Sequence, residues 1–410
     1  MSHTPCRFCG APLEAVFTDL GMSPLANSNV TPEKVNAMEA FYPLRALVCA
    51  KCFLVQLEEF ETPEQIFSED YAYYSSYSSS WLEHSKRYAE QMIERLSLDA
   101  SSQVVEIASN DGYLLQFFHD RKISVLGIEP AGNVADVATA KGIETVVEFF
   151  GEEVARSLAQ ESSADLLLGN NVLAHVPDLN DFVAGMKVLL KPDGVITMEF
   201  PHLMRLVDEN QWDTIYHEHF SYFSFRTVSA VFEAHGLRLF DVQELPTHGG
   251  SLRIYGAHAE DPQKPETDAA RELRERERAA GYEQLDTYLV YGQRVEQDKR
   301  QIVNFMIALK EEGLSIVGYG APAKGNTMLN YCGIRRDFLD YTVDLNPHKQ
   351  GHFLPGSHIP IRSPEQIRED KPDIVLILPW NLKDEIVEQL GFIREWGGRF
   401  AVRTPELTLL

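Results

Sequence analysis

The alternation of apolar and polar positions predicts two blocks of strands and helices. From residue 103 to about residue 255, short apolar runs that suit buried strands alternate with segments of helical periodicity. The predicted strands cover residues 104–107, 125–128, 165–168, 195–200, 237–243 and 252–255. This alternation is typical of a doubly wound α/β fold, in which the ligand lies outside the carboxyl ends of the strands.

A second α/β block begins at about residue 313. Its first strand is predicted to begin at residue 314, and two further strands are predicted over residues 341–344 and 373–380. The first strand leads into a turn with Gly318 and Gly320 and then into a helix, with Lys324 available to bind a phosphate. A dinucleotide-binding turn carries a third glycine, so this pattern is weak evidence for a dinucleotide.

Helical segments are predicted on either side of the first block. Residues 81–96 form an amphipathic pattern that leads into the first core strand. Residues 257–312 are charged, and their apolar positions recur at intervals of three, four or seven, as one buried helix face requires. We expect these latter helices to link two domains and to pack against both.

The first strand of the central block ends in a turn of small residues, Ala108 to Gly112, before a segment compatible with a helix. Backbone N–H groups in such a turn point at a ligand. The next predicted strand ends in Glu129, and a carboxylate at that position is placed to bind the two hydroxyls of a ribose. An NAD site and an S-adenosylmethionine (SAM) site both satisfy this pattern.

Four of the five cysteines lie in two CxxC pairs near the N-terminus. Two such pairs give the four thiolates of a tetrahedral zinc site, and four sulfur ligands leave no position open for catalysis. We therefore expect a structural zinc ion rather than a redox pair, bound by Cys6, Cys9, Cys49 and Cys52. The long loop between the pairs is expected to carry structure of its own, and it contains a turn-rich stretch, residues 21–27.

Composition restricts the classes of partner. The formal net charge of −24 disfavours nucleic acid and anionic membranes as partners. The sequence has no apolar run long enough to span a bilayer and no signal-peptide pattern at its start, so we expect a cytoplasmic protein. No sequence feature tests the oligomeric state, for which a monomer is expected.

Reactive side chains concentrate in three stretches. Residues 170–178 run from Asn170 and Asn171 to a turn that contains His175, and residues 212–222 hold two histidines, a glutamate and two tyrosines. The second stretch lacks the His-Glu-x-x-His spacing of a helical metal site, which argues against a metal. Because it is the densest cluster of reactive side chains in the chain, we favour a catalytic role over a polar surface loop. Residues 71–81 gather serines and aromatic rings that suit either sugar and phosphate binding or a helix N-cap.

Taken together, these motifs resemble the SAM-dependent sugar C-methyltransferases of deoxysugar biosynthesis. The resemblance covers the whole chain and rests on five stretches in the family's order, EIASNDG, NNVLAHVPD, YHEHFSY, HGGSLR and GYGAPAKGN. It implies a zinc domain over residues 1–70, a class I methyltransferase domain over 71–256, a helical linker over 257–312 and a Rossmann-like domain over 313–410. Ala108 and Asn110 stand where general methyltransferases carry glycines.

The resemblance also implies roles for individual residues. SAM contacts fall on Glu106, Ala108, Asn110, Gly112, Glu129, Phe149, Phe150 and Asn170. Contacts to a nucleotide-linked 4-keto-6-deoxy sugar, with TDP as the expected nucleotide and C3 as the expected position, fall on Tyr74, Ser76, Tyr77, Asn171, His175, Tyr222, His248 and Lys324.

The chemistry then requires a carbon nucleophile, because the methyl group of SAM is electrophilic. A base that removes the hydrogen beside the ketone leaves an enolate, and a largely neutral histidine suits that step. We expect His219 to be the base, with His175 as the competing candidate. Tyr216 and Glu218 are candidates for orienting the base or polarising the keto oxygen.

Other classes of protein share parts of this pattern. A zinc-containing RNA methyltransferase conflicts with the acidic charge, and an NAD-dependent nucleotide-sugar oxidoreductase conflicts with the missing third glycine in both turns. In a non-catalytic nucleotide-sugar binding protein, the cluster of reactive side chains at residues 216–219 would need another function. A SAM-dependent methyltransferase with another small-molecule acceptor also stays open.

Overall fold

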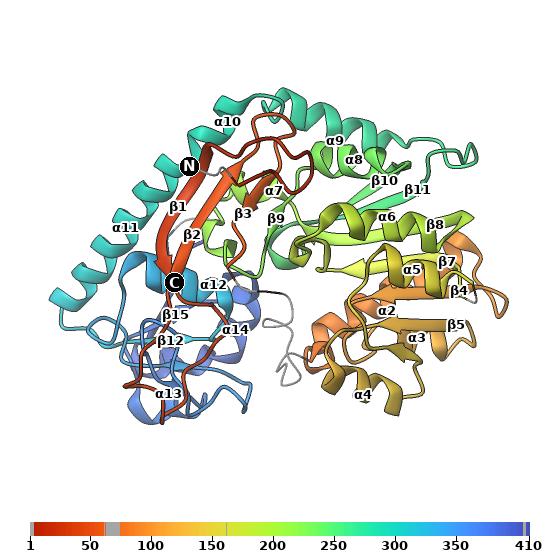
Figure 1. The fold of residues 1–410 in the computed structure, drawn as a ribbon. Coiled ribbons are helices and arrows are strands. Elements are labelled where there is room, and N and C mark those ends of the chain that lie inside the picture. The colour runs from red at the N-terminus through yellow and green to blue at the C-terminus, as the bar shows by residue number, and fades with distance from the viewer. Residues whose placement is uncertain (1–3, 61, 63–73, 161, 405–406) are drawn as a thin grey trace.

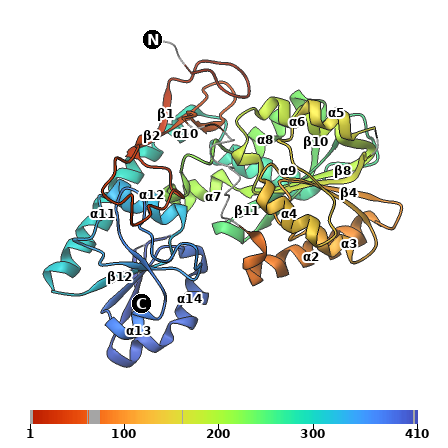
Figure 2. The same ribbon diagram turned by 60° about the horizontal axis from the view of Figure 1, so that its bottom comes forward.

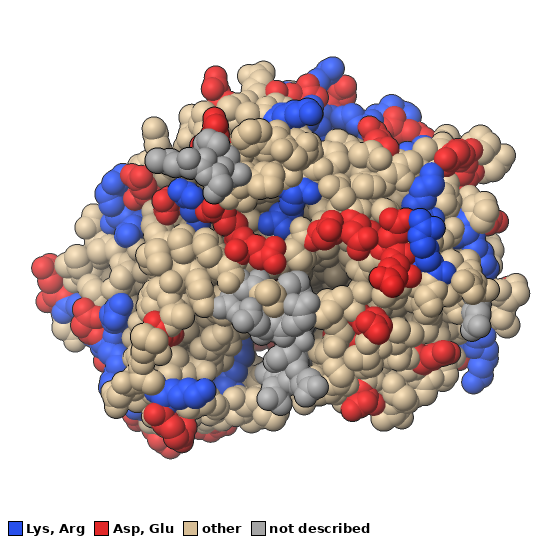
Figure 3. Space-filling model, viewed as in Figure 1, with Lys and Arg blue, Asp and Glu red and all other residues tan. Residues whose placement is uncertain are grey.

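The computed structural model describes residues 4–410 except 61, 63–73, 161 and 405–406, and these residues form three β-sheets with their helices (Figures 1 and 2). The sheets contain four, seven and six strands. No helix in the described part of the chain combines the length and apolar character needed to cross a membrane. On the face drawn in Figure 3, acidic side chains gather across the middle, whereas lysine and arginine side chains are scattered.

The N-terminal sheet is antiparallel, with the strand order β1-β2-β3-β9. Its strands are β1 (Ala15–Ser23), β2 (Tyr42–Val48), β3 (Val55–Leu57) and β9 (Ser221–Tyr222). The loop between the two CxxC pairs therefore carries strands, as predicted. The fourth strand comes from far along the chain, and the sequence pattern did not predict this pairing because two residues carry no strand periodicity.

The central sheet has the order β10-β11-β8-β7-β4-β5-β6, in which β4 to β8 are parallel and β11 is antiparallel to both neighbours. Its strands are β4 (Gln103–Ile107), β5 (Ser124–Ile128), β6 (Thr145–Val146), β7 (Ala164–Asn170), β8 (Leu190–Pro201), β10 (Leu237–Leu245) and β11 (Ser251–His258). All six predicted strands are present, and β6 is an addition. The carboxyl ends of the five parallel strands meet at one edge.

Helices cover both faces of the central sheet because successive residues of a strand point to opposite faces. Val104 packs in a core with Tyr88 and Phe118, whereas Val105 packs in a core with Phe182 and Phe232. In Figure 1, α2 and α3 cover one face and α5, α6 and α8 the other. The helices of this region are α2 (Ser79–Leu96), α3 (Leu115–His119), α4 (Gly132–Ala140), α5 (Glu152–Leu158), α6 (Leu179–Leu189), α7 (Leu203–Asp208) and α8 (Phe225–Ala234).

The C-terminal sheet has the order β14-β13-β12-β15-β16-β17 and is parallel except for β17. Its strands are β12 (Ile316–Tyr319), β13 (Thr342–Val343), β14 (Ile361–Arg362), β15 (Ile374–Ile377), β16 (Arg399–Val402) and β17 (Thr408–Leu409). Its helices are α12 (Ala323–Cys332), α13 (Gln366–Asp370) and α14 (Lys383–Gln389). The predicted strands are confirmed, with the second and third shorter than expected.

Three helices join the central and C-terminal sheets along the outside of the molecule (Figure 1). They are α9 (Asp268–Ala279), α10 (Leu285–Leu289) and α11 (Tyr291–Glu311). Their predicted apolar face is buried, as at Val295 and Met306. They pack against three regions rather than two: α9 on α8 and β10, α10 and α11 on β1, and α11 on α12.

Short 3-10 helices connect several of these elements. They are η1 (Ser75–Tyr77), η2 (Leu173–His175), η3 (Trp212–Thr214), η4 (Thr247–Gly249), η5 (Trp380–Leu382) and η6 (Gly391–Trp396).

Candidate active site

The turn after β4 adopts a glycine-like backbone although only one of its key positions is glycine. Ala108, Asn110 and Gly112 have φ angles of 56°, 49° and 74°. Asparagine tolerates this left-handed region, whereas alanine does so at a cost of about 1 kcal/mol. At Gly112 a Cβ would lie 2.5 Å from Ile143 Cδ1 and 3.3 Å from Ala138 Cβ, so a larger residue there would have to displace the Ile143 side chain as well as adopt a positive φ. The two replacements of glycine therefore preserve the shape of a ligand-binding turn.

Glu129, at the end of β5, closes this turn. The backbone N–H of Asn110 donates to one carboxylate oxygen at 3.0 Å, and that of Ala131 donates to the other at 2.9 Å. Burial raises the pKa of Glu129. Each carboxylate oxygen has a further lone pair, so Glu129 can hold the turn and still accept from ribose hydroxyls. The donor and acceptor set fits the ribose of SAM.

The other residues expected near SAM differ in exposure. Glu106 is buried inside β4, and burial raises its pKa well above the usual range. Asn170, at the end of β7, donates to Tyr113 Oη at 3.5 Å. Phe150 packs edge-on against Phe182 with ring centroids 5.3 Å apart, whereas Phe149 stays 39% exposed. Phe149 is therefore the ring left free to cover a base.

The aromatic and serine stretch folds against the same turn, and its residues 71–73 lie outside the described part of the chain. Asn133 donates to Tyr74 Oη at 3.1 Å, and Lys141 Nζ donates both to Ser76 Oγ at 3.1 Å and to Asp111 O at 2.7 Å. Tyr77 is 67% exposed. The helix N-cap role falls on Ser78, which accepts from Trp81 N, so the three residues expected to bind substrate are not the cap.

The reactive segment forms a turn, here named the His turn (residues 215–220), between η3 and β9. His219 Nδ1 lies 3.1 Å from the backbone oxygen of Thr214. Because a carbonyl only accepts, Nδ1 carries the proton and Nε2 is the basic nitrogen. Tyr216 Oη lies 2.9 Å from Nε2 and donates to it. The turn thus presents a tyrosine–histidine pair in one defined tautomer.

A second histidine lies against this pair. The His175 ring is edge-on to that of His219 at 4.7 Å, and His175 hydrogen-bonds to the backbone of Glu218. Burial lowers the pKa of His175 to about 4 and that of His219 well below its usual range. Tyr222 is buried with its ring 5.9 Å from His219. Both histidines are therefore neutral at pH 7, as a base must be.

The other two side chains of the turn point elsewhere. His217 Nε2 lies 3.2 Å from Pro43 O, against the N-terminal sheet, so it does not share a side with His219 as it would in a strand. Asn27 donates to both carboxylate oxygens of Glu218 at 2.8 Å. Burial raises the pKa of Glu218 to about 7. Asn27 was not predicted, although it lies in the turn-rich loop at residues 21–27.

Asn171, His248 and Lys324 complete the group that the sequence predicted. Asn171 Nδ2 lies 3.2 Å from His248 Nε2, and burial lowers the pKa of His248 to about 4. Lys324 lies over the ring of Trp380 at 4.4 Å and donates to Asn381, and burial lowers its pKa to about 8. Its charge also lowers the pKa values of His219 and His248, which places it beside the histidines.

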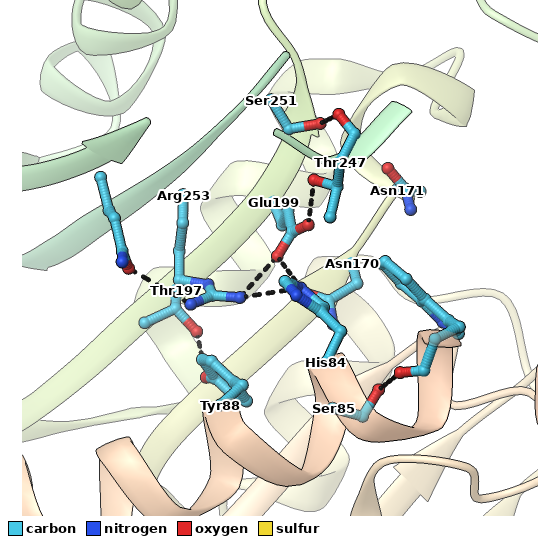
Figure 4. Close-up of polar contacts among 12 residues, drawn as sticks. His84, Ser85, Tyr88, Asn170, Asn171, Thr197, Glu199, Thr247, Ser251 and Arg253 are labelled. Atoms are coloured by element: carbon cyan, nitrogen blue, oxygen red, sulfur yellow. Dashed lines mark hydrogen bonds and ion pairs between the residues drawn. The ribbon is translucent and has the colours of Figure 1, made fainter. Parts of the chain in front are cut away.

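A buried polar network, which the sequence did not predict, supports the carboxyl edge of the central sheet (Figure 4). Glu199 in β8 pairs with Arg253 at 2.7 Å and His84 at 3.0 Å, and it accepts from Thr247 Oγ1 at 2.9 Å. Burial works to raise the pKa of Glu199, but His84 and Arg253 lower it to about 2. The only signal in the sequence was a charged residue inside an otherwise apolar strand. The network fixes Thr247, the neighbour of His248.

The four N-terminal cysteines form one cluster. The Sγ atoms of Cys6, Cys9, Cys49 and Cys52 all lie within 4.8 Å of one another, and none forms a disulfide. Four thiolates at this spacing fit a tetrahedral zinc ion, whose role is structural because no fourth position stays open.

Comparisons with known proteins agree with this geometry. Three family models match: a "Putative zinc binding domain" over residues 6–67, a methyltransferase domain over 81–242 and a C-methyltransferase C-terminal domain over 246–405. The chain is 37% identical over 402 residues to the C-methyltransferase NovU of Streptomyces niveus, covering 98% of this chain and 95% of that protein.

Two solved structures are similar to parts of the chain. One is the 1,6-didemethyltoxoflavin-N1-methyltransferase of Burkholderia thailandensis, with 17% identity, a TM-score of 0.38 and coverage of 50% of this chain and 95% of that one. The other is the PH0226 protein of Pyrococcus horikoshii OT3, with 15% identity, a TM-score of 0.38 and coverage of 48% and 99%.

Proposed function

The chain belongs to the SAM-dependent C-methyltransferase family, and we propose that it methylates C3 of a TDP-linked 4-keto-6-deoxy sugar. The observation that carries the proposal is the neutral Tyr216–His219 pair, with His175 beside it, at the edge of the sheet that holds the SAM turn. A base at that position is what carbon methylation requires and what transfer to an already nucleophilic nitrogen does not.

The cofactor is held by the turn after β4. Glu129 would accept from the ribose hydroxyls, the backbone near Ala108 and Asn110 would bind the methionine part, and the exposed ring of Phe149 would cover the adenine. Glu106, Gly112 and Asn170 lie on β4, in the turn after it and at the end of the neighbouring β7, and Phe150 packs against Phe182. When bound, SAM supplies the electrophilic methyl group.

Proton removal falls to the His turn. The base is His219: the hydrogen beside the ketone passes to its Nε2 by way of the Tyr216 hydroxyl, which donates to Nε2 at 2.9 Å and takes the hydrogen as its own proton moves on. The C–H electron pair becomes the enolate, and His219 becomes the imidazolium, whose Nδ1–H still donates to Thr214. With SAM bound, the enolate carbon would take the methyl group as the C–S bond breaks, and S-adenosylhomocysteine would be released.

Charge on the enolate oxygen needs donors in a water-poor pocket. Lys324 is a half-buried cation beside the histidines, and it is placed to polarise the ketone. The one N–H of neutral His175 already donates to the backbone of Glu218, so His175 stays the competing base rather than a donor to the enolate. The zinc site takes no part, because its four thiolates leave no ligand position for the sugar.

The sugar and its nucleotide are bound by the surrounding polar rim. Asn171, His248 and Tyr222 lie around the histidines, while Tyr74, Ser76 and Tyr77 flank the cofactor turn. A ring such as the exposed Tyr77 suits stacking on a base or sugar.

The test is mass spectrometry of the purified protein with SAM and a panel of TDP-4-keto-6-deoxyhexoses in D₂O, for the wild type and for His219→Ala. A gain of one methyl group with formation of S-adenosylhomocysteine is expected for the wild type, with loss of both methylation and deuterium exchange in the variant. Exchange that persists in the variant would assign the base to His175. No methylation of any sugar despite tight SAM binding would overturn the proposed acceptor.

A further inference from the structure

A buried arginine of the C-terminal region contacts the segment before the His turn. Arg403 follows β16 and is 3% exposed. Its guanidinium forms ion pairs with Asp213 at 2.9 Å and with Asp298 of α11 at 2.8 Å, and it lies 4.5 Å from the ring centroid of Trp212. These contacts join the C-terminal sheet, the long linking helix and η3 at one point.

Each of the three side chains of η3 forms a hydrogen bond that restrains the helix. Trp212 Nε1 donates to Asp298 at 2.6 Å, and Trp380 Nε1 donates to Asp213 at 2.8 Å. Thr214, the last residue of η3, is buried and donates through Oγ1 to Gln211 O at 2.7 Å. The short helix therefore has little freedom to shift.

The held helix presents the atom that sets the tautomer of His219. The Thr214 carbonyl accepts from His219 Nδ1, and this bond is what leaves Nε2 unprotonated toward Tyr216. A shift of about 1 Å at η3 would lengthen the bond beyond hydrogen-bonding distance. The contacts thus run from Arg403 through Asp213 and Thr214 to His219.

We propose that Arg403 is a positioning residue that fixes the orientation and tautomer of His219 through Asp213 and the Thr214 carbonyl. The proposal rests on the proposed function only in naming His219 as the proton acceptor. Desolvation makes a buried ion pair weak evidence for stability, so stability alone does not account for an arginine enclosed by two carboxylates. Arginine also offers a planar fork that lysine cannot replace.

The first measurement is ¹⁵N NMR of histidine-labelled protein without any acceptor. We expect the wild type to show His219 as the Nδ1–H tautomer, and Arg403→Met to show a mixture of tautomers. Asp213→Asn keeps the Arg403–Asp298 pair but weakens the link to η3, so it should give a smaller change and decides the matter if Arg403→Met does not fold. His219→Asn assigns the signal.

The second measurement is kinetic. Arg403→Met should lower kcat by about 10- to 100-fold, as expected for a misplacement of about 1 Å, with SAM affinity within about twofold of the wild type. The acid limb of the pH–rate profile should also move toward higher pH as water reaches His219. The groups that face His219 are His175, Tyr216, Tyr222, His248 and Lys324, and none is altered.

Glu39→Gln is the matched control. Glu39 also joins the N-terminal and C-terminal regions, by contacts to Gly356 N at 2.8 Å and His358 Nε2 at 2.9 Å, but does not touch η3. It should leave the tautomer and kcat unchanged. A folded Arg403→Met or Asp213→Asn protein with an unchanged His219 tautomer would overturn the proposal, whether or not kcat falls. Failure to methylate any sugar leaves the NMR result intact.

Discussion

The central and C-terminal sheets begin with the same local pattern but use it differently. In each, a strand leads into a small-residue turn and a helix, and the next strand ends in an acid, Glu129 or Asp344. Each acid accepts a backbone N–H from the turn, from Asn110 at 3.0 Å and from Ala321 at 2.7 Å. To this point the two turns are equivalent.

The space beyond the acid differs. In the C-terminal turn, Lys349 Nζ donates to Ala321 O at 2.9 Å and lies 3.9 Å from Asp344. Pro379 packs so closely that a Cβ on Gly320 would lie 2.6 Å from it. The remaining cavity is about 220 Å³, smaller than the roughly 300–1,000 Å³ of typical ligand sites.

The C-terminal turn also supports the site described above. Its helix carries Lys324, and Trp380 and Arg403 follow β15 and β16 in the chain. All three residues reach the region of η3 and the histidines. A turn with the sequence pattern of a nucleotide site predicts a backbone shape, and the side chains that fill the space decide whether a ligand enters.

The largest effect is expected at the central sheet. His219→Asn should lower the methylation rate by about 10²- to 10⁴-fold, the usual contribution of a general base, while Lys324→Met on the C-terminal side should lower it by about tenfold. Initial rates with SAM and the sugar measure both. A larger loss of rate for Lys324→Met than for His219→Asn would contradict the assignment of proton removal to His219.

Substitution of the two acids, Glu129 and Asp344, should show which of the two turns binds SAM. Glu129→Ala should weaken SAM binding by about 10- to 100-fold, because a hydrogen bond to a charged group contributes about 1.5–3 kcal/mol. Asp344→Ala is the matched control and should leave SAM affinity within about twofold. Titration calorimetry with S-adenosylhomocysteine tests both, and equal losses would show that the C-terminal acid also binds cofactor.

The N-terminal region contributes a smaller effect through Asn27. Asn27→Ala removes both contacts to Glu218 and should lower kcat by about three- to tenfold, since a hydrogen bond contributes about 0.5–1.5 kcal/mol. Steady-state kinetics measure the change, with the zinc content as control. An unchanged kcat would show that the Asn27 contacts do not support the His turn, which would leave that role to the contacts from the C-terminal region.

The smallest expected effect is a displacement along the pH axis. As the proposed base, His219 would act only when neutral. Because burial lowers its pKa, kcat/KM should stay constant from pH 7 down through 6.5 and fall only at lower pH. A pH–rate profile of the wild type tests this. If kcat/KM instead changes near pH 7 and this change disappears in Glu218→Gln, the titrating group is Glu218, whose pKa is raised to about 7.

The sequence allowed much of the fold to be predicted because its signals are local. Apolar runs marked the strands of the central sheet, and paired cysteines marked the metal cluster. The His turn and the turn after β4 were also visible, because reactive or small residues cluster there along the chain.

What the sequence could not show depends on pairing over long distances. Arg403, Asp213 and Asp298 form one cluster from three separate segments, and nothing in the periodicity of any segment points to the others. Asn27 reaches Glu218 across 191 positions. The strand pairing of β9 with β3 is of the same kind, since two residues are too few to show alternation.

The late position of Arg403 has a consequence for how the enzyme matures. Arg403 also donates to the carbonyl of Asn210, just before η3, and 193 positions separate the two. During synthesis, the residues of the central sheet and of its SAM turn emerge long before this arginine does. The segment before the His turn therefore gains its Arg403 contacts only after the last parallel strand of the C-terminal sheet has been made.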